Sequence, residues 1–280
     1  MESLCQGSVR GHHGMNAIPN RIAVIANQES HYARRVVDGL CRAGHPPACV
    51  FLGSRVQNIL FKLASLRRIW GRLGVTEVYL RLRQRGTGAE HSAEPLSLSL
   101  AELATQYDFE IRRYDKINQG SLAVELLSIP SCVTVLAGCG IVDLSIILAS
   151  RGGCVNGHPA WLPGLRGVDV YEWAILKEKH FGVTAHLVEE RVDAGKIVRR
   201  AQLQPEPGES FAQFYQRLLK AQAEVLCAAA IDLSEATGLR IDNDLSHSEL
   251  CFAMPNALKE QARKKYQQVF GKASIEADLS

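Results

Sequence analysis

The sequence lacks the cysteine spacing of a zinc finger, because none of its eight cysteines forms a Cys-x-x-Cys pair with another. Several cysteines lie within apolar runs, as Cys132 does in the run 131–135. A free cysteine behaves as a small apolar residue and persists as a thiol in reducing compartments. We therefore expect buried free thiols rather than disulfides, and no metal site.

Long apolar runs are also missing. A membrane-spanning helix is expected from a run of about 18 or more apolar residues, and the sequence contains no such run. Residues 1–20 are polar, with adjacent histidines at His12 and His13, and they lack the apolar core of a signal peptide. We expect residues 1–20 to form a flexible tail, the protein to be cytoplasmic, and no membrane partner.

A strong excess of charge is absent, since the formal net charge is only +3. This value gives no argument for nucleic-acid binding. The segment 55–85 is locally basic, and two interpretations of it stay open: a solvated helix face, or a surface for an anionic substrate such as a nucleotide sugar or a tRNA. Its basic residues are Arg55, Lys62, Arg67, Arg68, Arg72, Arg81, Arg83 and Arg85.

The hydrophobic pattern predicts strands that alternate with helices. Such alternation is typical of an α/β fold, Rossmann-like, with a mostly parallel sheet and helices on both faces, which binds ligands at the carboxyl ends of its strands. The predicted strands are 21–26, 48–52, 109–112, 132–137, 153–156, 183–188 and 197–201. The predicted helices are 30–43, 55–83, 119–128, part of 141–149, 210–236 and 257–270.

Glycine is missing from the first predicted strand-to-helix turn, residues 26–30. The dinucleotide fingerprint Gly-x-Gly-x-x-Gly needs glycines at that turn, so NAD and FAD are disfavoured as cofactors. A proline- and glycine-containing breaker at 204–208 separates the strands from the long helix that follows. We therefore expect an α/β domain over 21–205 and a small, mainly helical C-terminal region over 206–280.

The residues most suited to chemistry follow the predicted strand 153–156. Asn156 and His158 are spaced i, i+2, so a strand would point both side chains to one face. Pro159 and Pro163 stiffen the loop that follows. Asp193 stands in a glycine turn between two later strands and could reach back to His158. Taken singly, each of these residues would be an ordinary loop or turn former.

Three blocks together make the sequence resemble the formyltransferase family, which includes methionyl-tRNA formyltransferase, glycinamide ribonucleotide transformylase and sugar N-formyltransferases. The blocks follow the family patterns Asn-x-His-Pro-x-x-Leu-Pro-x-x-Arg-Gly at 156–167, Gly-Val-Thr-x-His at 182–186 and Asp-x-Gly-x-Ile at 193–197. The resemblance is close over about 130–200, weaker back to residue 21, and gives little guidance beyond 240. It implies that 21–205 is a formyltransferase catalytic domain.

The resemblance implies transfer of a formyl group from 10-formyltetrahydrofolate to an amine. Asn156 and His158 would stabilise the tetrahedral oxyanion that forms when the amine attacks the formyl carbon. Asp193 would orient His158, favour its charged form and help to relay the amine proton. The reaction requires no metal and no covalent enzyme intermediate.

Two further groups of residues follow from the resemblance. The folate is expected against two segments, of which Ile141 and Val142 offer apolar surface to a flat heterocycle, although plain core packing would also account for them. These segments are Cys139, Gly140, Ile141 and Val142, and Glu189, Glu190, Arg191 and Val192. Trp161, Arg166, Gly167 and Asp169 are assigned to the acceptor side.

The acceptor amine stays open. A small molecule, either an amino sugar nucleotide or a natural-product intermediate, fits best. The tRNA enzymes of the family tend to have a proline soon after the Arg-Gly of the first block, and they carry a β-barrel C-terminal domain. Here no proline closely follows Arg166–Gly167, and the residues after 205 are predicted to be helical. Methionyl-tRNA is thereby disfavoured.

Hydrolysis of 10-formyltetrahydrofolate is the other alternative, although relatives with that activity usually carry an N-terminal regulatory domain that 1–20 cannot form. A silent folate-binding scaffold would not need Asn156, His158 and Asp193. The helical C-terminal region could supply a homodimer surface, but its pattern does not demand one.

Overall fold

A computed structural model describes residues 21–53, 98–130 and 132–271. The predicted tail 1–20 lies outside the described residues, as do the predicted helix 55–83 and the basic segment 55–85 that contains it. Among the described helices, none is long and apolar enough to cross a membrane.

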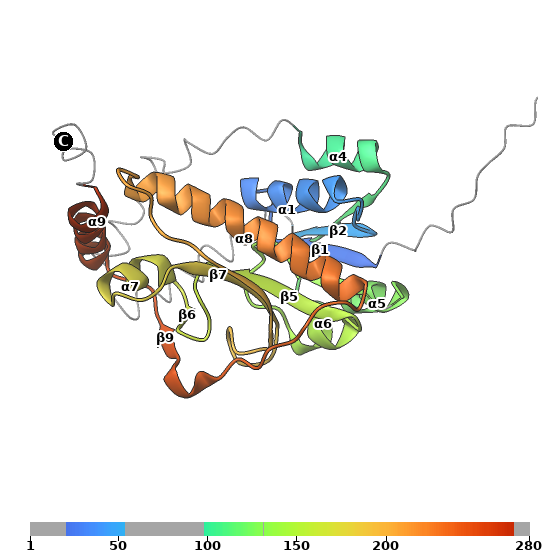
Figure 1. The fold of residues 1–280 in the computed structure, drawn as a ribbon. Coiled ribbons are helices and arrows are strands. Elements are labelled where there is room, and N and C mark those ends of the chain that lie inside the picture. Colours follow the sequence, from blue (N-terminus) through green and yellow to red (C-terminus); the bar gives the residue numbers. More distant parts are fainter. Residues whose placement is uncertain (1–20, 54–97, 131, 272–280) are drawn as a thin grey trace, which may run out of the picture.

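A seven-stranded sheet forms the centre of the molecule, in the order β3-β2-β1-β4-β5-β7-β8 (Figure 1). The first five of these run parallel, and β7 and β8 are antiparallel to their neighbours. The mostly parallel sheet with helices on both faces is therefore confirmed. The strands are β1 (Ile22–Ala26), β2 (Cys49–Gly53), β3 (Glu110–Tyr114), β4 (Val133–Leu136), β5 (Gly153–His158), β7 (Gly182–Leu187) and β8 (Ile197–Gln202).

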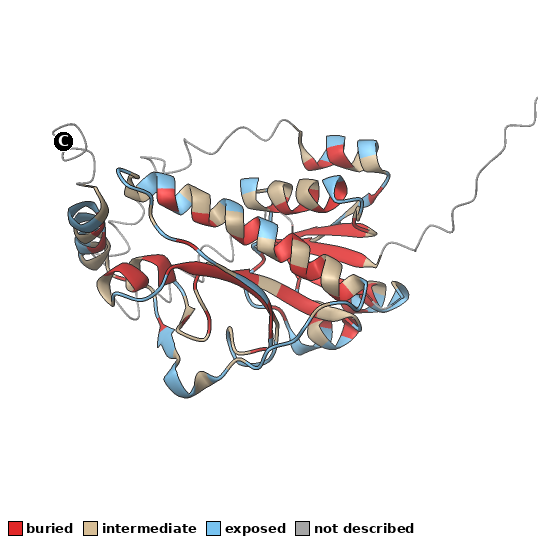
Figure 2. Ribbon diagram, in the orientation of Figure 1, coloured by how far each residue is buried: buried red, intermediate tan, exposed pale blue. Residues whose placement is uncertain are grey.

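One face of the sheet is covered by α1 (His31–Arg42), α4 (Leu100–Tyr107) and α8 (Phe211–Ser234). Ser30 caps α1, since its side chain accepts a hydrogen bond from the Ala33 amide. Helix α4 was not predicted, although its capping box, formed by Ser99 and Glu102, is visible in the sequence. The opposite face is covered by α5 (Gly120–Ser128) and α6 (Leu144–Ala149). Figure 2 shows the strands buried between these helices.

A third packing unit lies beside the sheet. Its apolar cluster joins α7 (Val170–Leu176) to α9 (Asn256–Phe270). Two three-residue strands, β6 (Leu165–Gly167) and β9 (Glu249–Cys251), pair in parallel at its edge. None of β6, α7 and β9 was predicted, because elements this short show too few hydrophobic periods to be recognised.

Helix α8 lies on the C-terminal side of the predicted boundary near residue 205, yet it packs against α1 and against β4, β5, β7 and β8. Its buried face belongs to the same apolar cluster as the strands. The division at 205 stays a prediction, and α8 is the element that joins its two sides.

The two apolar clusters also define the faces of β5. Val155 packs in the cluster under α1 and α8, and Cys154 packs in the cluster under α5 and α6. Because side chains alternate along a strand, Asn156 and His158 share the α5–α6 face and Gly157 faces α1 and α8.

Candidate active site

Strand β5 carries Asn156 and His158 to the carboxyl edge of the sheet. The register between β4 and β5 ends at the pair Leu136 and Asn156, so β5 runs on past its neighbour. On the other side, β7 continues to pair with β5, and Thr184 lies opposite His158. The two side chains differ in exposure: Asn156 is half-buried and His158 is 3% exposed.

The loop that follows β5 is anchored by the next two strands. The buried Thr184 hydroxyl donates to the Ala160 carbonyl at 2.8 Å and accepts from the Leu162 amide at 3.1 Å. Arg200 donates to the Leu162 carbonyl at 2.8 Å. Its guanidinium also lies 4.1 Å from the ring centre of Trp161, a cation–π contact. Neither Thr184 nor Arg200 was predicted as part of the site.

Asp193 stands in the turn between β7 and β8. Its φ of 49° places it in the left-handed region. The turn requires a glycine at 195, because a Cβ there would lie 2.0 Å from the Leu187 carbonyl oxygen. Asn243 holds the turn from outside by donating to the carbonyls of Asp193 and Gly195, at 3.1 Å and 3.2 Å. The turn therefore directs the Asp193 carboxylate back toward β5.

The carboxylate of Asp193 lies between two imidazole rings. Its Oδ2 is 3.4 Å from Nδ1 of His158 and accepts from the Gly167 amide at 2.8 Å. Its Oδ1 is 3.3 Å from Nε2 of His186. His186 belongs to the block 182–186 that carries the resemblance, but it was not predicted as part of the site.

Each imidazole donates its other N–H to a backbone carbonyl. His158 Nε2 donates to Leu165 at 2.9 Å, and His186 Nδ1 donates to Leu187 at 2.8 Å. A neutral imidazole has one N–H, so in its neutral form each ring presents a lone pair to Asp193. For His158, the nitrogen that carries this lone pair is Nδ1, 3.4 Å from Asp193.

The charges of the site follow from its burial. Burial lowers the pKa of His158, and the nearby Asp193 carboxylate, which raises it, does not compensate. We expected Asp193 to favour the charged imidazole; it does act in that direction, but desolvation is the larger effect. For Asp193, burial would raise the pKa, yet the hydrogen bond and charge of His186, the charge of His158 and the Gly167 amide together lower it to about 2.

A cavity of about 330 Å³ lies against this cluster, and Asn156, His186 and Asp193 form part of its wall. His158 does not line it. The structure brings seven of the eight expected folate-contacting residues to the cavity, and it places the Cys139 side chain in the core instead, 4% exposed. The seven are Gly140, Ile141, Val142, Glu189, Glu190, Arg191 and Val192.

One wall of the cavity is the turn after β4. Gly138 and Gly140 have φ angles of 78° and 77°, values that glycine tolerates without strain. Asn118 fixes the next residues by donating to the Ile141 carbonyl at 3.1 Å and accepting from the Asp143 amide at 3.0 Å. Ile141 is thereby held with 71% of its surface exposed. Asn118 was not predicted from the sequence.

The four residues assigned to the acceptor side have separate environments. Gly167 contacts Asp193, and a Cβ there would lie 2.1 Å from the Cys251 carbonyl oxygen. Arg166 donates to the Ser248 hydroxyl at 2.6 Å and to the Val192 carbonyl at 2.9 Å. Trp161 stacks on Arg200, as described above. Asp169 accepts from the Met254 amide at 2.8 Å and from Lys259 at 2.7 Å, and so ties α7 to the segment before α9.

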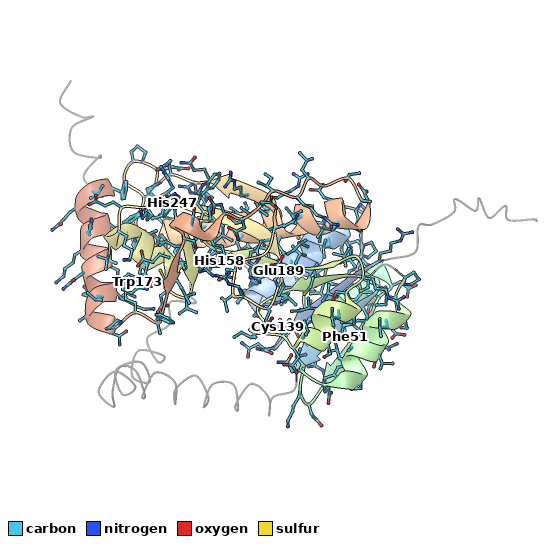
Figure 3. All side chains as sticks on the ribbon, turned by 90° about the horizontal axis from the view of Figure 1, so that it is seen from below. Phe51, Cys139, His158, Trp173, Glu189 and His247 are labelled. Carbon is cyan, nitrogen blue, oxygen red and sulfur yellow. The ribbon has the colours of Figure 1, made fainter. Side chains whose placement is uncertain are left out.

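The buried His158 lies toward the middle of the molecule. Figure 3 shows His158 and Glu189 near the middle, with Trp173 toward one end and Phe51 toward the other. The β6–β9 pair and the sheet meet here, because Leu165 and Gly167 of β6 bond to His158 and Asp193.

Residues 101–230 match the family model described as formyl transferase. The match includes β5, its anchored loop and the Asp193 turn. Over these residues the chain is therefore similar to the formyl transferase family. The resemblance noted in the sequence is thus confirmed.

Sequence relatives of the chain include methionyl-tRNA formyltransferases. That of Clostridium tetani is 26% identical over 170 residues, which are 59% of this chain and 54% of the relative. That of a Synechococcus strain is 32% identical over 127 residues, 45% of this chain and 39% of the relative. The chain thus spans about half the length of the curated relatives it matches.

Solved structures agree on the fold. Glycinamide ribonucleotide transformylase 1 of Symbiobacterium toebii is 18% identical, with a TM-score of 0.55 over 84% of this chain and 100% of that one. An N-formyltransferase of Helicobacter canadensis, in complex with folinic acid and dTDP-3-aminofucose, is 11% identical, with a TM-score of 0.52. The likeness covers 82% of this chain and 70% of that one. At such identities the likeness concerns the fold alone.

Proposed function

We propose that the protein transfers a formyl group from 10-formyltetrahydrofolate to the primary amine of a small molecule. The observation that carries this proposal is the meeting of Asn156 and Asp193 at the wall of a single cavity. The cavity provides a polar end, where these side chains lie, and apolar surface from Ile141, Val142 and Val192. A donor that joins a flat heterocycle to a reactive formyl group needs both.

The lining residues fit a reduced folate. Ile141 and Val192 are 71% and 44% exposed, and a flat ring placed on them would remove apolar surface from water. The turn at 138–140 brings backbone polar groups to the same wall. When bound, the donor supplies the formyl carbon that the amine takes up.

Asn156 is suited to stabilise negative charge. It is a neutral donor, it is half-buried at the cavity, and its carboxamide has no hydrogen-bond partner among the described residues. An amide N–H aimed at an oxygen that gains charge acts as an oxyanion donor, and removing one such donor typically costs about 2.7–4 kcal/mol of barrier. Asn156 is therefore the proposed oxyanion donor.

The pair of His158 and Asp193 is suited to take the proton that the attacking amine loses. Burial favours neutral His158, whose Nδ1 then carries a lone pair 3.4 Å from Asp193. Protonation of Nδ1 converts that contact into an ion pair with the ionised carboxylate. We therefore assign the proton uptake to the pair as a unit, with Asp193 as its member at the cavity wall, and the pair would return the proton to N10 of the departing tetrahydrofolate.

The acceptor is proposed to be a small amine, such as an amino sugar nucleotide or a natural-product intermediate. After residue 205 the described chain contains α8, β9 and α9 rather than the strands of a β-barrel. Methionyl-tRNA is the second candidate, because the sequence relatives reported above carry that name. Hydrolysis of the donor is the third, with water in place of the amine.

We also propose a cytoplasmic location. The cysteines in the described part of the chain are all unpaired and buried, in keeping with a reducing compartment.

Two measurements test the proposed function. The first is thermal unfolding with 5-formyltetrahydrofolate, a stable analogue of the donor. At about a hundred times its Kd a ligand adds about 2.7 kcal/mol of stability, which would raise Tm by several degrees. An unchanged Tm at saturating analogue would end the donor assignment.

The second measurement is release of tetrahydrofolate from 10-formyltetrahydrofolate in the presence of single acceptors. The panel contains dTDP-amino sugars, glycinamide ribonucleotide, methionyl-tRNA and a reaction without amine. Release that requires a small amine supports the proposal. Release only with methionyl-tRNA, or equally without any amine, would replace it with the second or the third candidate.

A further inference from the structure

Behind the catalytic strand, α1 and α8 approach β5 at Gly157, the residue between Asn156 and His158. A Cβ at this position would lie 2.9 Å from the Tyr32 hydroxyl oxygen and 3.2 Å from Cγ of Gln222. The first distance is shorter than real Cβ contacts, so only glycine allows both helices to come so close. The face of β5 opposite the site is therefore in direct contact with two side chains that the mechanism above does not use.

Gln222 makes a specific hydrogen bond there. Its side-chain Nε2 donates to the Gly157 carbonyl at 2.6 Å, although Gln222 lies in α8, far along the chain. The side chain is buried, with Gln222 8% exposed, so the bond has no competition from solvent. The register of β4 with β5 has already ended at Asn156, and from Gly157 onward β7 is the one described strand that pairs with β5. Gln222 thus binds the strand at the point where the sheet supports it on one side only.

We propose that Gln222 is a positioning residue for the reaction: its amide fixes the peptide between Asn156 and His158 and so sets the direction of both side chains. The inference rests on the proposed formyl transfer and deepens it. The carbonyl of Gly157 belongs to the peptide unit that leads into His158. A rotation of that unit would turn His158 away from Asp193 and change the direction of the Asn156 carboxamide. A misplacement of about 1 Å at a catalytic group can cost about a hundredfold in rate.

Tyr32 offers a matched control. Its hydroxyl touches the same glycine and is buried, but it makes no hydrogen bond within the described residues. Tyr32→Phe therefore removes a polar atom beside Gly157 without breaking a bond to the strand. If only packing behind β5 mattered, Tyr32→Phe and Gln222→Met would have similar effects. If the bond to Gly157 matters, only the second would change turnover.

The main experiment compares Gln222→Met with wild type and with Tyr32→Phe in the full-length protein. Gln222→Met keeps the length of the side chain and removes the donor. We expect kcat to fall about ten- to a hundredfold, with the KM for 10-formyltetrahydrofolate within twofold of wild type, whereas Tyr32→Phe keeps the wild-type kcat. A wild-type kcat in Gln222→Met, or an equal loss in Tyr32→Phe, would overturn the inference.

Two further variants separate positioning from general support. In an Asn156→Ala background, Gln222→Met should reduce kcat by a smaller factor than it does in the wild-type background, because the part of its effect that acts through Asn156 is already lost. If Gln222→Met reduced kcat by the same factor in both backgrounds, the inference would be contradicted. Gln222→Glu cannot donate when ionised but can donate when protonated, and burial favours the protonated form. Its kcat relative to wild type at the same pH should therefore rise as the pH falls. A ratio that does not change with pH overturns the inference even if Gln222→Met fails to fold.

A readout without substrate keeps this inference distinct from the proposed function. In nitrogen NMR of histidine-labelled protein, Gln222→Met should shift the His158 ring resonances and Tyr32→Phe should leave them in place. Unshifted His158 resonances in Gln222→Met would end the positioning role. Absence of formyl transfer by wild type with every amine would instead end the proposed function.

Discussion

Oδ1 of Asp193 lies 3.3 Å from Nε2 of His186, so the carboxylate that faces His158 is held from its other side by a second histidine. His186 occupies β7, opposite Asn156 in the strand register. The same strand pair therefore carries both the proposed oxyanion donor and the group that controls the charge of Asp193.

The substitution His186→Asn tests this control. The asparagine amide can replace Nδ1 as donor to the Leu187 carbonyl, but nothing replaces Nε2 beside Asp193. The pKa of Asp193, about 2 in the native protein, should rise toward its ordinary value, because the hydrogen bond and charge of His186 are lost. A carbon NMR titration of labelled aspartate measures it. The exposed His180, changed to Asn, is the control, and a pKa of Asp193 that stays near 2 in His186→Asn would show that His186 has no such influence.

Asn156→Ala should reduce kcat at least about a hundredfold, the usual loss when an oxyanion donor is removed. Binding of 5-formyltetrahydrofolate should change by less than threefold, because the donor acts on charge that develops during the reaction. Steady-state rates and a Tm series with the analogue measure the two quantities. A loss of binding equal to the loss of rate would show instead that Asn156 only helps to hold the donor.

Asp193→Asn should also lower kcat at least about a hundredfold, because it removes the ionised partner of the protonated imidazole. The amide can still accept from the Gly167 amide, so the fold should survive. Asp242→Asn is the control, since the Asp242 side chain is 88% exposed and its ion pair among the described residues is with Lys196. Formyl-transfer rates and far-UV circular dichroism would be measured for both variants, and near-wild-type turnover of Asp193→Asn would refute its role in proton uptake.

The sequence was sufficient to predict that Asn156, His158 and Asp193 come together, but not which other residues hold them in place. Two prolines and a glycine turn define the local geometry of these residues, and local geometry is what spacing reports. Gln222, Asn243 and Arg200 contact the same backbone from other parts of the chain. No periodicity links residues so far apart. Their contribution depends on tertiary packing, which one sequence does not contain.

The protonation state of His158 could not be predicted from the sequence for a related reason. A neighbouring aspartate suggested a protonated ring, and the structure does bring the two together. The larger effect is burial, which lowers the pKa of His158 and arises from β6 and the anchored loop that cover it. The mostly parallel sheet, by contrast, was predictable, because it follows from the order of apolar runs along the chain.

The lowered pKa of His158 predicts a dependence of stability on pH. In the unfolded chain the ring has its usual pKa of about 6.5, and in the folded protein the pKa is lower. Between the two values the unfolded chain binds more protons, so the free energy of unfolding rises with pH. The contribution is complete above about pH 6.5 and is lost as the pH falls below it. Urea unfolding between pH 5 and 7 should show a shallower slope in His158→Gln than in wild type, and the same slope in the exposed-site control His180→Gln.

The apolar wall of the cavity makes the last prediction. Ile141 is 71% exposed and lines the cavity, whereas Leu148 on α6 is 70% exposed and does not. An aspartate at 141 would remove apolar contact and add negative charge beside Glu189 and Glu190, which line the same cavity. A folate carries carboxylates of its own, so both changes oppose binding. We expect Ile141→Asp to weaken 5-formyltetrahydrofolate binding at least about tenfold, or about 1.4 kcal/mol, as measured by calorimetry. Leu148→Asp makes the same chemical change at equal exposure and should leave the Kd within twofold of wild type. Equal weakening in both variants would mean that the added charge acts at a distance, and that the wall formed by Ile141 does not contact the donor.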